Sequence, residues 1–131
     1  MIIDKVALLL LRDRRLLCAR SVGNAVWYLP GGKREPGESD GQALAREIRE
    51  ELDVRLMPDT LVFAGEFEAQ ADGRPAGTRV RSRCYFGAVE GVPAPAAEIE
   101  ALAWMRHCDG IQGSQTLRLV LDHLLTERLI D

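Results

Sequence analysis

The feature that most constrains this chain is an acidic, amphipathic helix predicted from about Ser39 to Asp53. At about 100° per residue, the apolar side chains of this stretch recur on one face and its glutamates on another. The glutamates are Glu47, Glu50 and Glu51, at spacings i, i+3 and i+4. Like charges at these spacings destabilise a helix by a few tenths of a kcal/mol per pair, and a bound cation would remove that cost. A divalent cation such as Mg²⁺, which takes oxygen ligands and keeps some waters, suits the cluster.

A solvated surface is the simpler interpretation of an acidic helix face. Arg46 lies four residues before Glu50, so ordinary ion pairs could account for much of the pattern. The wider spacing favours a binding site instead. Five residues separate Gly32 from Glu38, seven separate Glu38 from Arg46, and Arg46 opens the sequence Arg-Glu-Ile-Arg-Glu-Glu-Leu-Asp-Val. Chemically specific residues at such fixed intervals rarely occur together by chance.

The stretch from Gly32 to Val54 closely resembles the signature of the Nudix hydrolases. One position departs from that pattern, because Asp53 stands where the family usually has glycine at the helix C-terminus. Glycine suits the left-handed conformation of this position, and Asp is among the few other residues that tolerate it. We therefore expect a modest cost in stability and an intact site.

The resemblance implies a reaction in which water attacks a nucleoside diphosphate linked to another group. It also implies a divalent cofactor, Mg²⁺ or alternatively Mn²⁺, because a bound metal neutralises the phosphates and lowers the pKa of coordinated water. A MutT-like (d)NTP pyrophosphohydrolase is the favoured activity, with ADP-ribose or a nucleotide-sugar as the main alternative substrate. A non-catalytic Nudix module that senses a nucleotide is the alternative from another class. The intact glutamates disfavour it, because a binding module has no need of mutually repulsive carboxylates.

By the same resemblance, each charged residue of the motif has an expected role. Glu50 and Glu51 are the expected principal metal ligands. Glu47 is the candidate general base or a further metal ligand. Glu38 would join the metal through water, and Arg46 would orient a glutamate.

A second candidate for the general base lies outside the motif. Some family members take the base from a loop before a later strand, and Glu98 occupies a comparable place here. Glu100 and Glu66 are weaker candidates. The alternative for Glu98 is a solvated carboxylate on a loop, since loops commonly carry charge.

Two glycines stand directly before the acidic helix. Gly31 and Gly32 allow the backbone to approach a ligand closely or to take positive φ, so they are candidate substrate-binding residues. A tight turn is the simpler interpretation of the pair.

Two arginines are further candidates for substrate binding. The predicted strand 78–89 carries Arg81 and Arg83 on one face. Arginine's planar fork suits recognition of substrate phosphate. The alternative is cross-strand pairing with Glu66 and Glu68 of the preceding strand, and the sequence leaves both interpretations open.

The remaining elements indicate an α/β fold. Apolar or alternating runs predict strands at residues 6–11, 16–20, 61–70, 78–89 and 98–104, and a final helix that Ser114 caps. The third and fourth of these strands are expected to form a hairpin. This order favours a mixed sheet between helices, and the resemblance implies the α/β/α sandwich of the Nudix fold. We expect residues 1–131 to form a single domain.

Composition limits the partners and the compartment. A formal net charge of -3 argues against a nucleic-acid polymer, but not against a small nucleotide held through a metal. The three cysteines are odd in number and widely separated, which is typical of reduced thiols in a cytoplasmic protein. No apolar run approaches membrane-spanning length, so we expect no membrane association. A homodimer is the protein assembly that we consider.

Overall fold

The computed structural model describes the whole chain, residues 1–131. In chain order the elements are β1 (Ile2–Leu9), β2 (Leu11–Arg12), β3 (Arg15–Ser21), β4 (Gly31–Gly32), α1 (Asp40–Leu52), β5 (Arg55–Gln70), β6 (Arg79–Glu90), β7 (Ile99–Met105), the 3₁₀ helix η1 (His107–Gln112) and α2 (Gln115–Thr126). Both predicted helices are present, and each predicted strand corresponds to one of these elements. No helix has the length and apolar character that crossing a membrane requires.

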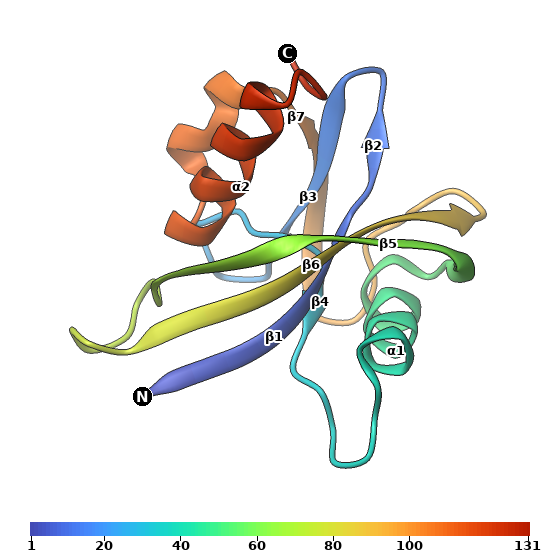
Figure 1. The fold of residues 1–131 in the computed structure, drawn as a ribbon, viewed down its shortest axis with the longest axis horizontal. Helices are drawn as coiled ribbons and strands as arrows, with labels where there is room; N and C mark the ends of the chain where they lie inside the picture. Colours follow the sequence, from blue (N-terminus) through green and yellow to red (C-terminus); the bar gives the residue numbers. More distant parts are fainter.

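The strands are divided between two sheets. One has the order β4-β1-β6-β5, and the other has the order β2-β3-β7. Strands β1 and β6 run parallel, whereas the other neighbouring pairs are antiparallel, so the larger sheet is mixed. Figure 1 shows α1 and α2 on opposite sides of the strands. The predicted α/β/α sandwich with a mixed sheet is therefore confirmed.

The predicted hairpin is formed by β5 and β6. Strand β5 begins at Arg55, earlier than the predicted start at residue 61. Pro58 hid this extension, because proline cannot donate a hydrogen bond to a neighbouring strand and is rare within sheets. The structure accommodates Pro58 where the pairing with β6 shifts between Met57 and Val62, on the edge strand of the sheet.

Strand β1 contributes to both hydrophobic cores, because alternate side chains of a strand point to opposite faces of its sheet. Val6 and Leu8 belong to the core that packs against α1. Ala7 and Leu9 belong to the core that packs against α2. The strand is thus held on both of its faces.

Helix α1 is fixed by its buried face and by its N-cap. The predicted apolar face is confirmed, since Leu44, Ile48 and Leu52 have no exposed surface. The hydroxyl of Ser39 accepts the N–H of Gln42 at 3.1 Å, and the Gln42 side chain accepts the N–H of Ser39 at 3.0 Å. This reciprocal capping box satisfies backbone donors that the first turn would leave unpaired.

The helix ends at Asp53, which adopts the left-handed conformation with φ 53° and ψ 39°. Its N–H donates to the carbonyl of Arg49 at 3.2 Å. The position therefore has the conformation for which the Nudix signature uses glycine.

Replacing Asp53 by glycine should stabilise the protein. We expect Asp53→Gly to raise the free energy of unfolding by roughly 0.5–1 kcal/mol, because relief of left-handed strain exceeds the extra entropy of glycine in the unfolded chain. Arg49→Gly, at an exposed right-handed position of the same helix, should lower it by about 1 kcal/mol. Thermal denaturation of both variants would measure the difference. A lower melting temperature for Asp53→Gly than for the parent protein would contradict this account of the cap.

Candidate active site

A cavity of about 550 Å³ lies beside the acidic helix. Its lining comes from β1, the segment between β3 and β4, β4, α1, the end of β5 and the loop after it, β6 and the start of α2, with Glu98 from the segment before β7. Of the residues singled out in the sequence, it brings together Gly31, Gly32, Glu47, Glu51 and Glu98. The carboxylates and the glycine pair thus meet at one place, although they are distant in sequence.

Glu51 is the buried carboxylate of the site. It is only 4% exposed, and its Oε1 accepts the N–H of Gly31 at 2.9 Å. Burial raises the pKa of Glu51 to about 8. The hydrogen bond from Gly31 opposes that rise in pKa, whereas the nearby carboxylates Glu47 and Glu98 add to it. A negative charge at Glu51 is therefore costly unless a cation approaches through the cavity.

The two glycines make room for this arrangement. A Cβ atom on Gly31 would lie 2.1 Å from the carbonyl oxygen of Val6, so only glycine can pair this closely with β1 and aim its N–H at Glu51. A Cβ atom on Gly32 would lie 2.5 Å from the carboxylate carbon of Glu47. The pair therefore does more than turn the chain, because it leaves space for two carboxylates of α1.

Arg46 fixes Glu47 and the loop before α1. Its Nε and Nη2 donate to the two oxygens of Glu38 at 2.8 and 2.9 Å, and its Nη1 donates to Glu47 Oε1 at 2.9 Å. Nη2 also donates to the carbonyl of Lys33 at 3.0 Å. The paired hydrogen bonds from Arg46, with one from the N–H of Glu35, lower the pKa of Glu38 to about 2. Burial, partly opposed by Arg46, raises the pKa of Glu47.

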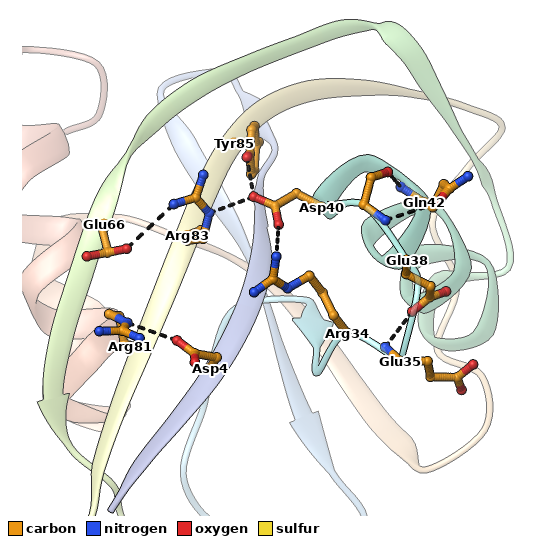
Figure 2. A network of polar contacts seen from close by, with 11 residues as sticks. Asp4, Arg34, Glu35, Glu38, Asp40, Gln42, Glu66, Arg81, Arg83 and Tyr85 are labelled. Atoms are coloured by element: carbon orange, nitrogen blue, oxygen red, sulfur yellow. Dashed lines mark hydrogen bonds and ion pairs between the residues drawn. The ribbon is translucent and has the colours of Figure 1, made fainter.

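Glu38 and Glu50, two of the expected metal ligands, do not line the cavity. Both oxygens of Glu38 accept hydrogen bonds from Arg46 of α1, and one also accepts the N–H of Glu35 (Figure 2). The Glu50 side chain is 54% exposed and lies 3.7 Å from Arg46. Glu50 and Glu51 are adjacent, but successive side chains of a helix point in different directions around its axis. Glu50 therefore faces solvent and Glu51 faces the sheet.

Glu98 differs from the weaker candidates for the base. It lines the cavity, and its side chain takes part in no hydrogen bond or ion pair of the structure. Glu100 instead pairs with Arg20 at 2.8 Å, and Glu66 lies 3.7 Å from Arg83. Neither Glu100 nor Glu66 lines the cavity.

The carboxylates of the cavity suit a divalent cation. Of Glu47, Glu51 and Glu98, only Glu47 has a charged partner within ion-pair distance, which is Arg46. No three His, Cys, Asp or Glu side chains are already grouped so as to hold a metal ion. Mg²⁺ does not need such a group, because it keeps several waters and is commonly bound by one or two carboxylates together with substrate phosphates. The donor set therefore fits Mg²⁺ held jointly by protein and substrate.

Arg81 and Arg83 lie on the other face of β6. Strand alternation points Ser82 into the cavity and the two arginines away from it, and neither arginine lines the cavity. Arg81 Nε lies 2.8 Å from Asp4, and Arg83 Nε lies 2.6 Å from Asp40 (Figure 2). Both arginines form ion pairs, but mostly not with the expected glutamates: Glu66 lies 3.7 Å from Arg83, and Glu68 pairs with Arg79 at 2.9 Å.

Asp40 is the centre of that ion-pair network. It is the first residue of α1, and it also accepts the hydroxyl of Tyr85 and pairs with Arg34 at 2.9 Å (Figure 2). Although burial acts to raise the pKa of Asp40, the hydrogen bonds from Tyr85 and Arg83 hold this pKa below its ordinary value. The network thus attaches the N-terminus of α1 to the sheet.

Lys5 is a cavity residue that the sequence pattern does not single out. Lys5 lines the cavity from β1, beside Ser82 on the neighbouring strand β6. The available signal was a single charged side chain next to the apolar run that begins at Val6. A charged residue at this place is equally typical of the end of a strand, so only the fold reveals where Lys5 points.

A comparison with known families bears directly on this site. The model of the NUDIX domain matches residues 1–120. The chain belongs to the NUDIX family. The resemblance of the motif from Gly32 to Val54 is thereby confirmed over most of the chain.

Similar NUDIX proteins differ in how much of their length this chain spans. The CTP pyrophosphohydrolase of Escherichia coli K12 is 30% identical over 114 residues, which are 84% of this chain and 80% of that protein. The solution structure of the E. coli ORF135 protein superposes with a TM-score of 0.74 and 27% identity, covering 97% of this chain and 91% of that one. The 8-oxo-dGDP phosphatase NUDT18 of Homo sapiens is 40% identical over 58 residues, 44% of this chain but only 16% of that protein. The chain therefore spans a small part of the human relative and most of the bacterial one.

Truncation of the paired arginines should affect stability and not substrate binding. We expect Arg81→Ala and Arg83→Ala to leave the Michaelis constant unchanged and to lower the free energy of unfolding by up to about 1 kcal/mol. Arg83→Ala should be the more destabilising, because its partner Asp40 is only 13% exposed, against 47% for the Asp4 partner of Arg81. Steady-state kinetics and thermal denaturation would separate the two effects. A large rise in KM with an unchanged melting temperature would restore the phosphate-binding interpretation.

Proposed function

We propose that this NUDIX protein hydrolyses a nucleoside diphosphate derivative with Mg²⁺ as its cofactor, and that Mn²⁺ can replace Mg²⁺. The observation that carries the proposal is the environment of Glu51. A buried carboxylate with a raised pKa and no cationic partner faces a cavity of about 550 Å³, a size typical of small-molecule sites. Lys5 is near enough to lower the pKa of Glu51 but forms no ion pair with it, whereas a buried glutamate with a purely structural role would be expected to form one.

The residues of the cavity have distinct proposed roles. Glu51 and Glu47 would hold the metal, and Glu50 would join them by rotating its exposed side chain. The metal supplies charge neutralisation at the phosphates and a more acidic coordinated water. Arg46 keeps the Glu47 carboxylate in place through its hydrogen bond of 2.9 Å. Because the carboxylate is already in position, less entropy is lost on reaching the transition state.

Glu98 is the proposed general base. Its carboxylate faces the cavity without a hydrogen-bond partner, so an oxygen is free to take the proton of the attacking water. Glu47 is the alternative base, but one of its oxygens already accepts a hydrogen bond from Arg46. Glu47 therefore has one oxygen fewer to offer to the attacking water, whereas the Glu98 side chain accepts no hydrogen bond from the protein.

A nucleoside triphosphate, in the deoxy or the ribo form, is the proposed substrate class. The support comes from the bacterial relative of similar length, which is named a CTP pyrophosphohydrolase. A relative in Enterobacter, 53% identical over 45 residues, is named a nucleoside triphosphatase. ADP-ribose or a nucleotide-sugar is the alternative substrate.

A substrate screen in Mg²⁺ tests the proposal. A nucleoside triphosphate should give nucleoside monophosphate and pyrophosphate, whereas ADP-ribose would give AMP and ribose 5-phosphate. In ¹⁸O-water, label in the nucleoside monophosphate would place the attack at the α-phosphorus. Exclusive cleavage of ADP-ribose would overturn the substrate class, and no turnover of any diphosphate would favour a nucleotide-sensing module instead.

Variants in the same assay test the general base. Glu98→Gln should lower kcat by about 100-fold or more if Glu98 takes the proton. Glu100→Gln is the matched control, because Glu100 pairs with Arg20 outside the cavity and should not affect kcat. A large loss in Glu47→Gln with nearly normal turnover in Glu98→Gln would assign the proton transfer to Glu47.

We also propose that residues 1–131 act as one domain in the cytoplasm. Strand β1 contributes to both hydrophobic cores, which supports a single unit. Cys18, Cys84 and Cys108 are free thiols, as expected in a reducing compartment. The homodimer stays a prediction, which sedimentation or light scattering would test.

A further inference from the structure

The chain contains only two lysines, and both line the cavity. They are Lys5 of β1 and Lys33, which follows β4. Strands β1 and β4 are antiparallel and pair Val6 with Gly32, so the next position of this register places Lys5 beside Lys33. Apart from two histidines, all other basic side chains of the protein are arginines.

Neither lysine ammonium group has a partner within the protein. No ion pair or hydrogen bond of the structure includes the Nζ atom of Lys5 or Lys33, whereas Arg46, Arg81 and Arg83 are all held by carboxylates. Glu51 and Glu47 are close enough to raise the pKa of Lys5 but not to form an ion pair with it. Burial and the neighbouring Lys33 outweigh these carboxylates, so the pKa of Lys5 lies below its ordinary value. Lys5 is half-buried and Lys33 is exposed. Two neighbouring ammonium groups that no carboxylate pairs with repel one another, and a bound anion would remove that repulsion.

A third unpaired cation comes from the loop between β5 and β6. Arg74 lines the cavity and contributes to the lowered pKa of Lys5. Its loop is fixed at two points. The amide of Gln70 accepts the N–H of Gly77 at 3.0 Å, and Asp72 accepts the N–H of Gln115 at the start of α2 at 3.0 Å. The cation is therefore carried on an ordered loop that closes one side of the cavity.

Two hydroxyl groups complete the set of donors. Ser82, opposite Lys5 on β6, is only 4% exposed, and Thr116 of α2 is 8% exposed. Both line the cavity, and neither hydroxyl takes part in a hydrogen bond with the protein. The cavity thus combines carboxylates on the α1 side with free cationic and hydroxyl donors beside them. A phosphate chain has the charge and the acceptor oxygens that these donors need.

We propose that Lys5 is a substrate phosphate-binding residue, and that Lys5, Lys33 and Arg74 together select a triphosphate chain over a diphosphate such as ADP-ribose. This inference rests on the proposed function, because it names the substrate class of the same site. A triphosphate carries more negative charge than a diphosphate, so the loss of one cation costs it more binding energy. The selected feature is the number of phosphates and not the identity of the base.

Kinetics of Lys5 variants test this selection. We expect Lys5→Gln to lower kcat/KM for a nucleoside triphosphate by about tenfold or more, and to lower it less for ADP-ribose. Lys5→Arg, which keeps the charge, should recover much of the loss. Arg55→Gln is the control, because Arg55 pairs with Glu90 at the far end of β5 from the cavity. Equal losses on both substrates, or a change in base preference alone, would overturn the proposal.

The scarcity of lysine allows a second test that needs no turnover. Reductive methylation with ¹³C-formaldehyde keeps the charge and labels only Lys5, Lys33 and the N-terminal amine. Without divalent metal, both lysine signals should shift at a lower concentration of inorganic tripolyphosphate than of pyrophosphate, with the Lys5 signal assigned by its absence in Lys5→Gln. A Lys5 signal that responds to a free nucleoside but not to tripolyphosphate would overturn the proposal. A protein that hydrolyses nothing but shows the tripolyphosphate shifts would refute the proposed hydrolysis and leave the phosphate site standing.

Discussion

The hydrogen bond from the Gly31 N–H to the Glu51 carboxylate, 2.9 Å long, joins the strand side of the site to the helix side. It depends on the absence of a side chain at Gly31, where a Cβ atom would lie 2.1 Å from the Val6 carbonyl oxygen. It also depends on the apolar face of α1, which presses the helix onto β1 through Ile48 and Leu52. An acidic side chain is thereby kept at a buried position of a helix, where an apolar one would be more stable.

Two polar networks keep the acidic helix in place, although the buried carboxylate is electrostatically unfavourable. Arg46 joins Glu38 of the preceding loop to Glu47 of the helix. Asp40, at the first turn, joins the helix to Arg34 and to Arg83 of β6. The first network ties α1 to the loop before it and the second ties α1 to the sheet, so the helix that carries Glu47 and Glu51 is held in place. Carboxylates on a helix that is held in place stay close together and repel one another until a cation binds. Such a prearranged site favours metal binding.

The local features of this fold could be predicted from the sequence, because they depend on residues close together in the chain. Helical spacing and the signature around Glu38 and Arg46 located the acidic helix, and Ser39 and Asp53 marked its ends. The choice between the two faces of β6 could not be predicted, since it depends on which side of the sheet each helix covers. For this reason the sequence allows Arg81 and Arg83 at the substrate site, although they lie on the other face.

The same limit explains the remaining differences. Glu50 and Glu51 are adjacent and chemically identical, and only tertiary packing makes one 54% exposed and the other buried. Lys5 precedes an apolar run and could equally have pointed to either face, because a strand's alternation gives relative and not absolute directions. Its contact with the cavity follows from the parallel pairing of β1 with β6, which brings together residues far apart in sequence.

The most direct test of the central claim is the pH dependence of stability in the parent protein and in Glu51→Gln, with and without Mg²⁺. The pKa of Glu51 is about 8 in the folded protein against an ordinary value of 4.5, so between these values the folded state keeps a proton that the unfolded state has lost. Stability should therefore fall as pH rises through this window, by at most about 1.4 kcal/mol per pH unit.

Without metal, the parent protein should lose stability relative to Glu51→Gln as pH rises from 5 toward about 8. Mg²⁺ should reverse that loss of stability in the parent protein and have little effect on Glu51→Gln, because only the ionised carboxylate binds the cation. Parallel pH profiles, with the same response to Mg²⁺ in both proteins, would contradict the claim that Glu51 is a buried carboxylate awaiting a metal ion.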